Sequence, residues 1–386
     1  MKKPVRLIIV LAMALSLAAC GSKEEAEEMD TTQDVKAEGQ AVKEEDAAKE
    51  PEEEHTAKKT SVEVAEPDAE EFEYYYDAVL GGVKITGYNG EAEAIRIPAE
   101  INGDPVREIS LRNKTITQIE CPDSVTSISV SGCSSLTEIT LPSGITSIGG
   151  AAFMDCSSLT EITLPDSITS IGGSAFYDCS SLTEITLPGG ITSIGGAAFK
   201  GCSSLTEITL PDSITSIGGS AFYDCSSLTE ITLPSGITSI DSSAFKGCSS
   251  LTSITFPDSL EIIEESAFEG CSSLTEIILP NSVTSIGGFA FYDCSSLTEI
   301  TLSNNLKSIA GMVFADCVGL TSVTIPDSVI AIRTEAFFEC TGLRNITIIN
   351  SDTIIYPGAF IGCADLTVTY QGQEYNYAND PEGWWG

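Results

Sequence analysis

Residues 179–201 read CSSLTEITLPGGITSIGGAAFKG, and this stretch of 23 residues returns along most of the chain. Its apolar skeleton is LxxIxLPxxIxxIxxxAF, and a cysteine opens each copy. The cysteines that mark the period are Cys133, Cys156, Cys179, Cys202, Cys225, Cys248, Cys271, Cys294, Cys317, Cys340 and Cys363. A fixed period of this length indicates a repeat protein in which each copy forms one structural unit.

The spacing inside one copy predicts its local structure. Apolar and polar residues alternate over 185–187, as in a half-buried strand, and Pro188 ends that strand. Residues 191–194 predict a second short strand, and 195–196 predict a tight turn. For residues 197–201 we expect one helical turn that carries its phenylalanine inward.

One such coil cannot fold alone. Its seven apolar side chains contribute about 2 kcal/mol each on burial, whereas each residue loses about 1–2 kcal/mol of backbone entropy. Neighbouring coils must therefore stack, with leucine on leucine and phenylalanine on phenylalanine. The predicted fold is a repeat solenoid of short parallel strands stacked in 23-residue coils.

The LxxIxL core resembles a leucine-rich repeat, and the whole unit is similar to the BspA-like subclass of bacterial surface proteins. The similarity runs from about Glu91 to Phe360. The unit lacks the asparagine that commonly follows the strand in leucine-rich repeats, so an asparagine ladder is not expected. The resemblance implies extracellular adhesion or host-protein binding, without catalysis.

The N-terminus has the features of a secretory signal. Three basic residues precede an apolar run over 7–15, which is too short to span a bilayer. The string Leu17-Ala18-Ala19-Cys20 resembles the lipobox of bacterial lipoproteins, which implies cleavage before Cys20 and a lipid on its sulfur. The alternative is an ordinary signal peptide that happens to end before a cysteine.

These patterns divide the chain into five predicted parts. They are a lipoprotein signal peptide (1–19), a lipidated cysteine with a disordered acidic tether (20–71), an N-terminal cap with degenerate repeats (72–132), ten leucine-rich repeats (133–362) and a C-terminal cap and tail (363–386). The tether is rich in Glu, Lys and Ala and cannot bury enough apolar surface to fold. In the tail, we expect the aromatic residues to cover the last coil.

Composition excludes several kinds of function. The chain of 386 residues has Lys+Arg 19 against Asp+Glu 56, a net charge of -37 that opposes binding to nucleic acid. Its single histidine, His55, lies in the tether, so histidine-dependent nucleophilic catalysis and zinc sites built on imidazoles lack their residues. We therefore expect no enzyme activity, no resident metal and no cofactor.

The column of repeating cysteines allows two interpretations. Cysteines in a secreted protein suggest disulfides or metal ligands. Here, however, they are an odd number of stacked side chains that point the same way, whereas a disulfide requires opposed side chains. We expect small buried thiols that fill a narrow corner of each coil.

The outward residues of the first strand are the candidate binding site. They form an acidic column of Glu138, Glu161, Glu184, Glu207, Glu230, Glu276 and Glu299, flanked by the hydroxyls of Thr163, Thr186 and Thr209. Parallel strands would place successive carboxylates about 4.8 Å apart. Such a column could bind Ca²⁺ or a basic partner segment, or it could be an ordinary solvated face. Hydroxyls of Thr160, Thr183 and Thr206 could also contact a partner.

We therefore expect a non-catalytic adhesin or receptor-like module. It would be anchored by Cys20 on the extracellular face of a bacterial envelope and would present a repetitive face to a protein or glycan. A flat repetitive face offers no unique pair of carboxylates for catalysis. The alternative is a structural or spacer protein of the envelope without a specific ligand.

Overall fold

The computed structural model describes residues 63–376. The predicted signal peptide, most of the predicted tether and the end of the predicted tail lie outside these residues. Within the described range the regular structure is a series of β-strands and one 3₁₀ turn, Ala69–Glu71.

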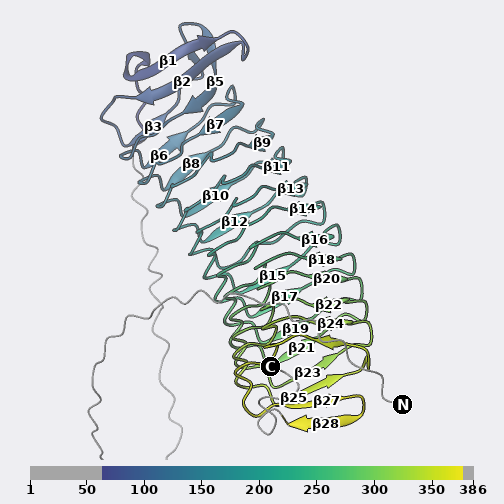
Figure 1. Cartoon of the computed structure of the whole chain (residues 1–386). Coiled ribbons are helices and arrows are strands. Elements are labelled where there is room, and N and C mark those ends of the chain that lie inside the picture. The colour runs from purple at the N-terminus through teal and green to yellow at the C-terminus, as the bar shows by residue number, and fades with distance from the viewer. Residues whose placement is uncertain (1–62, 377–386) are drawn as a thin grey trace, which may run out of the picture. The chain divides into compact units, whose positions relative to one another are not determined.

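The coils stack through two series of short parallel strands, which Figure 1 shows side by side along the stack. The first series is β3 (Ala94–Arg96), β6 (Gln118–Glu120), β8 (Glu138–Thr140), β10 (Glu161–Thr163), β12 (Glu184–Thr186), β15 (Glu230–Thr232), β17 (Ser253–Thr255), β19 (Glu276–Ile278), β21 (Glu299–Thr301), β23 (Ser322–Ile325), β25 (Asn345–Ile348) and β27 (Thr367–Tyr370). The second is β7 (Ser127–Ser129), β9 (Ser147–Ile148), β11 (Ser170–Ile171), β13 (Ser193–Ile194), β14 (Ser216–Ile217), β16 (Ser239–Ile240), β18 (Ile262–Ile263), β20 (Ser285–Ile286), β22 (Ser308–Ile309), β24 (Ala331–Ile332) and β26 (Ile354–Ile355).

The register of these strands confirms the predicted solenoid. Glu161 lies opposite Glu184 and Ile162 opposite Ile185, so each residue meets its equivalent one coil later. The isoleucines face the core and are buried, while the residues on either side of them are exposed. Period-2 alternation in the sequence is thus realised as a strand with one buried and one solvated face.

A column of phenylalanines forms the centre of the core. It consists of Phe153, Phe176, Phe199, Phe222, Phe245, Phe268, Phe291, Phe314, Phe337 and Phe360, all of which are buried. Neighbouring rings stack with centroids 5.2 to 5.7 Å apart. Stacking at this separation, with little tilt between the ring planes, places the bulkiest side chain of every coil against the next one.

The prediction of a helical turn over 197–201 is wrong. Ala197 and Gly201 have left-handed backbone angles, with φ of 55° and 77°. Their conformation turns alternate peptide N–H groups toward the following coil instead of along a helix. Three N–H groups, those of Ala197, Phe199 and Gly201, donate to the carbonyls of Gly219, Ala221 and Tyr223 at 2.8–2.9 Å. This corner therefore joins coils by hydrogen bonds that a helical turn would have used internally.

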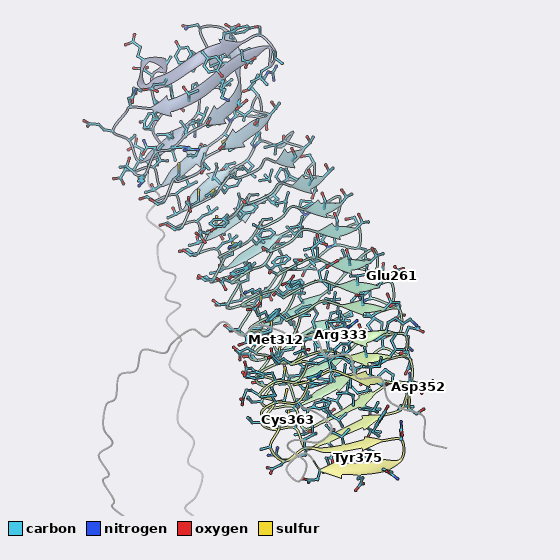
Figure 2. All side chains as sticks on the ribbon, viewed as in Figure 1. Glu261, Met312, Arg333, Asp352, Cys363 and Tyr375 are labelled. Atoms are coloured by element: carbon cyan, nitrogen blue, oxygen red, sulfur yellow. The ribbon has the colours of Figure 1, made fainter. Side chains whose placement is uncertain are left out.

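The eleven repeating cysteines, Cys133 to Cys363, are buried, and most lie beside the phenylalanines. From Cys179 to Cys363, each Sγ donates to the carbonyl of the phenylalanine 26 residues earlier, at 3.0–3.3 Å. Burial raises the pKa of the Cys271 thiol to about 12. Figure 2 shows Cys363 on one side of the stack and Asp352 on the opposite side. The thiols thus stabilise one edge of the stack as neutral hydrogen-bond donors.

Antiparallel strands cover both ends of the stack. At the N-terminal end, β1 (Phe72–Asp77) pairs antiparallel with β2 (Gly82–Tyr88). Strand β5 (Asp104–Ser110) pairs parallel with β2 and β7 and antiparallel with the short β4 (Glu100–Ile101). Ala65 adds a further bridge beside β3. At the C-terminal end, β28 (Gln373–Asn376) folds back on β27, and Figure 2 places Tyr375 on this last strand.

Alkaline pH should destabilise the fold through these thiols. A buried thiol with a raised pKa stabilises the folded state fully below its unfolded pKa, near 8.5. This contribution is lost as pH rises toward the folded value of about 12 for Cys271. We expect Cys271→Ala to reduce the pH dependence of the free energy of unfolding by about 1.4 kcal/mol per pH unit above pH 9. Urea unfolding between pH 7 and 11 measures the slope.

Ala267→Gly is the control, because it weakens the same buried corner without removing a titrating group. It should lower stability by a similar amount at every pH. Equal slopes for Cys271→Ala and the wild-type chain would contradict the role given to the thiol.

Candidate functional site

The first series of strands arranges the acidic column predicted from the sequence. Glu161, Glu184 and Glu207 are exposed and lie opposite one another in successive coils. The buried isoleucine beside each glutamate determines this direction, since neighbouring residues of a strand point to opposite faces. The remaining members occupy the same position in their own coils: Glu138, Glu230, Glu276 and Glu299. Ser253 interrupts the column between Glu230 and Glu276.

The threonines around this column divide into two groups. Thr163 and Thr186 are exposed and lie opposite one another, and Thr209 occupies the same exposed position in the next coil. In contrast, the hydroxyls of Thr183 and Thr206 donate to the carbonyls of Thr160 and Thr183 at 3.2 and 3.4 Å. These hydrogen bonds help to hold neighbouring coils together. Contact of these exposed threonines with a partner stays a prediction.

Two hollows open at the N-terminal end of the acidic column. The first, of about 320 Å³, lies between β8 and β10. Its lining residues are Glu138, Ile139, Thr140, Leu141, Ser143, Glu161, Ile162, Thr163 and Pro165. The second, of about 690 Å³, is lined by Glu66, Pro67, Asp68, Arg96, Ile97, Pro98, Ala99, Glu120, Cys121, Pro122 and Thr140. Thr140 borders both hollows.

Sequence reasoning missed these hollows. The residues of β8 and β10 read Glu-Ile-Thr like those of many other coils. No residue type in these strands therefore distinguishes the first hollow in the sequence. The degenerate coils carried the available signal, because Arg96 and Glu120 replace threonine and Cys121 replaces leucine at equivalent positions. Cys121 is also the partly exposed member of the described cysteines, whereas the others are buried.

A second surface feature lies at the corner beside the phenylalanines. Tyr177, Lys200 and Tyr223 occupy one position in successive coils, and the Lys200 ammonium lies 4.3 Å from the Tyr223 ring centroid and 5.7 Å from that of Tyr177. The following residues are Asp178, Gly201 and Asp224 in these coils, and Asp178 Oδ1 lies where a Cβ on Gly201 would be placed. Asp155 and Asp178 follow one another in consecutive coils, so aspartate is also accommodated there. The Tyr and Lys side chains pack against one another, so their alternation has a structural role.

The described residues were also compared with the requirements for a metal site and a membrane span. Between residues 63 and 376, no cluster of three or more His, Cys, Asp or Glu side chains is arranged to hold a metal ion. In the same range, no helix has the length and apolar character needed to cross a bilayer.

Stacked 23-residue coils with two series of short parallel strands define a leucine-rich repeat solenoid. The BspA type leucine rich repeat region matches residues 105–227, 130–252 and 238–367. The chain belongs to this family. It is thereby a repeat-based binding or structural protein, a class that is typically not enzymatic.

Solved structures with the same fold support this assignment. A leucine rich cell surface protein from Faecalibacterium prausnitzii is 32% identical, with a TM-score of 0.55, and the match covers 81% of this chain and 96% of that one. A leucine-rich repeat protein from Bacteroides ovatus is 29% identical, with a TM-score of 0.58, covering 77% of this chain and 92% of that one. A search of curated proteins gives no match.

The acidic column should destabilise the fold, because like charges directly opposite each other in neighbouring strands repel. We expect the triple variant Glu161→Gln, Glu184→Gln and Glu207→Gln to raise Tm by about 1–2 °C at low ionic strength. The difference should shrink in 1 M NaCl, where the Debye length is about 3 Å. Thermal unfolding followed by circular dichroism measures both values.

Asp166→Asn with Asp212→Asn provides a matched control. These exposed carboxylates have uncharged residues, Ser143, Gly189 and Ser235, at the equivalent position of adjacent coils. Their neutralisation should leave Tm nearly unchanged. A lower Tm for the glutamate variant would contradict the repulsion.

Proposed function

We propose that the protein is a lipid-anchored, non-catalytic surface protein whose strand face binds an extracellular protein or glycan. The observation that carries this proposal is the column of exposed carboxylates held in register over successive coils. Because repulsion within the column opposes folding, its presence in so many coils favours a role in binding. The outward Thr163, Thr186 and Thr209 add hydroxyls beside the same column.

The location follows from two further considerations. The string before Cys20 has the form of a lipobox, and two or three acyl chains bind a membrane stably where a single chain gives only marginal binding. The similar protein from Faecalibacterium prausnitzii is described as a cell surface protein. We place this protein on the extracellular face of the bacterial envelope, with Cys20 in the membrane and the repeats beyond the tether.

Replacing the lipid-bearing residue tests the anchor. We expect Cys20→Ala to release the protein into the culture medium, because its thioether cannot form. Immunoblots of medium and membrane fractions measure the distribution, and Cys121→Ala is the control that should stay with the membrane. Retention of Cys20→Ala in the membrane fraction would contradict lipid anchoring through this residue.

Ligand capture tests the strand face. The released Cys20→Ala chain should bind a component of extracellular extracts saturably, and Glu161→Gln, Glu184→Gln and Glu207→Gln together should reduce capture at least about tenfold. Asp166→Asn with Asp212→Asn should leave it unchanged. Repeating the measurement with EDTA shows whether Ca²⁺ takes part, since oxygen-rich sites are those that Ca²⁺ prefers.

The second candidate, a structural spacer of the envelope, predicts a different result. It would show no saturable capture by the wild-type chain under any of these conditions. Its support is the near identity of the coils between Cys156 and Cys248, in which the same outward residues recur without a singular feature. Capture that the glutamate variant abolishes would exclude this candidate.

A further inference from the structure

The two hollows share Thr140 in their linings and together extend across the ends of β3, β6, β8 and β10. We refer to them jointly as the groove. Strands in a sheet lie about 4.8 Å apart, so the groove crosses about 15 Å of the stack. This length equals roughly four or five residues of an extended peptide.

The groove begins where the pairing of neighbouring coils changes. Strands β3, β6 and β8 form one hydrogen-bonded sheet, and β10 pairs with β12 in another. Within the described residues, no ladder joins β8 to β10, although they are consecutive in the stack. The same interruption occurs between β17 and β19 and between β21 and β23.

About half of the residues that line the groove are apolar, and we call this part of the lining the floor. It includes Leu141, a series of prolines and the partly exposed Cys121. The prolines are Pro67, Pro98, Pro122 and Pro165. None of the lining residues is aromatic, so the groove lacks the ring faces on which a sugar would stack. Aliphatic side chains of a peptide fit such a floor better than a glycan does.

The walls of the groove are acidic. Five carboxylates line it, those of Glu66, Asp68, Glu120, Glu138 and Glu161. The cation in the lining, Arg96, already pairs with two of them: its Nε lies 2.8 Å from Glu120 Oε2, and a second nitrogen contacts Glu66. With five carboxylates and one arginine, the lining carries a net negative charge that favours a cationic occupant.

We propose that this groove binds an extended segment of a partner protein in which arginine or lysine alternates with aliphatic residues. The basic side chains would meet the carboxylates of the walls, and the aliphatic side chains would cover the apolar floor. This inference rests on the proposed function and deepens it, because it selects a protein partner and confines recognition to the N-terminal end of the strand face.

Two variants of equal charge test the groove. Thr140 and Thr255 are both exposed and occupy the same strand position, but Thr140 borders both hollows whereas Thr255 lies in β17, outside them and beside Ser253, where the acidic column is interrupted. An arginine at position 140 would reach into the groove and compete with the peptide. We expect Thr140→Arg to weaken binding about tenfold or more, while Thr255→Arg changes it less than about twofold.

The probe is a fluorescein-labelled hexapeptide of alternating arginine and leucine, titrated against the full Cys20→Ala chain by fluorescence anisotropy. Hexapeptides of alternating glutamate and leucine, and of alternating arginine and serine, should bind at least about tenfold more weakly. The first comparison reports the acidic walls and the second reports the apolar floor. Equal binding of all three peptides would overturn the proposal.

A second pair of variants allows the same test if Thr140→Arg misfolds. If Thr140→Arg lowers Tm, Glu120→Gln in the groove and Asp212→Asn outside it replace the first pair, and only the groove variant should weaken binding. Equal losses for both positions would show recognition by the overall negative charge of the chain, which overturns the groove. Absence of binding by the arginine–leucine peptide would also overturn the groove, whereas capture from extracellular extracts would still support the proposed function.

Discussion

The stack depends on hydrogen bonds that each coil makes with the next one. At the corner beside the phenylalanines, N–H groups such as that of Phe199 donate to the following coil, while thiols such as that of Cys202 donate backward. A single coil would leave these groups unpaired. Because buried polar groups without partners are costly, the same bonds that stabilise the stack make an isolated coil unfavourable. The aromatic column then places a large apolar side chain in every layer, so packing and hydrogen bonding favour the same register.

This constraint explains the residues that vary as well as those that recur. The position before each cysteine is left-handed and holds Asp or Gly in the near-identical coils, because these residues adopt that conformation with little cost. The carboxylate of Asp178 lies against Gly201, whereas Asp155 and Asp178 occupy this position in consecutive coils. Outward positions of the strands are under no such restriction. A recurring glutamate there is therefore more informative about function than a recurring cysteine inside the core.

The sequence predicted the strands and the core because side-chain chemistry alone determines them: Ile185 alternates with threonine, and Phe199 recurs at a position that only a buried layer would favour. It failed at Ala197, an ordinary helix former whose left-handed angle follows from bonding to the next coil. The acidic column could likewise be predicted from the regular spacing of its glutamates. The groove beside Thr140 could not be predicted, because that residue has the same neighbours in sequence as Thr163. Arg96, Glu120 and Cys121, which depart from the repeat, were the residues that marked this region.

The antiparallel strands that cover the two ends have an evolutionary consequence. Since β1 and β28 each protect an end of the stack, whole coils can be inserted between them without creating a new exposed edge. Unequal recombination between near-identical stretches of the gene would then yield longer or shorter proteins that still fold. The reach of the molecule from the cell can thus evolve separately from the surface at its first coils.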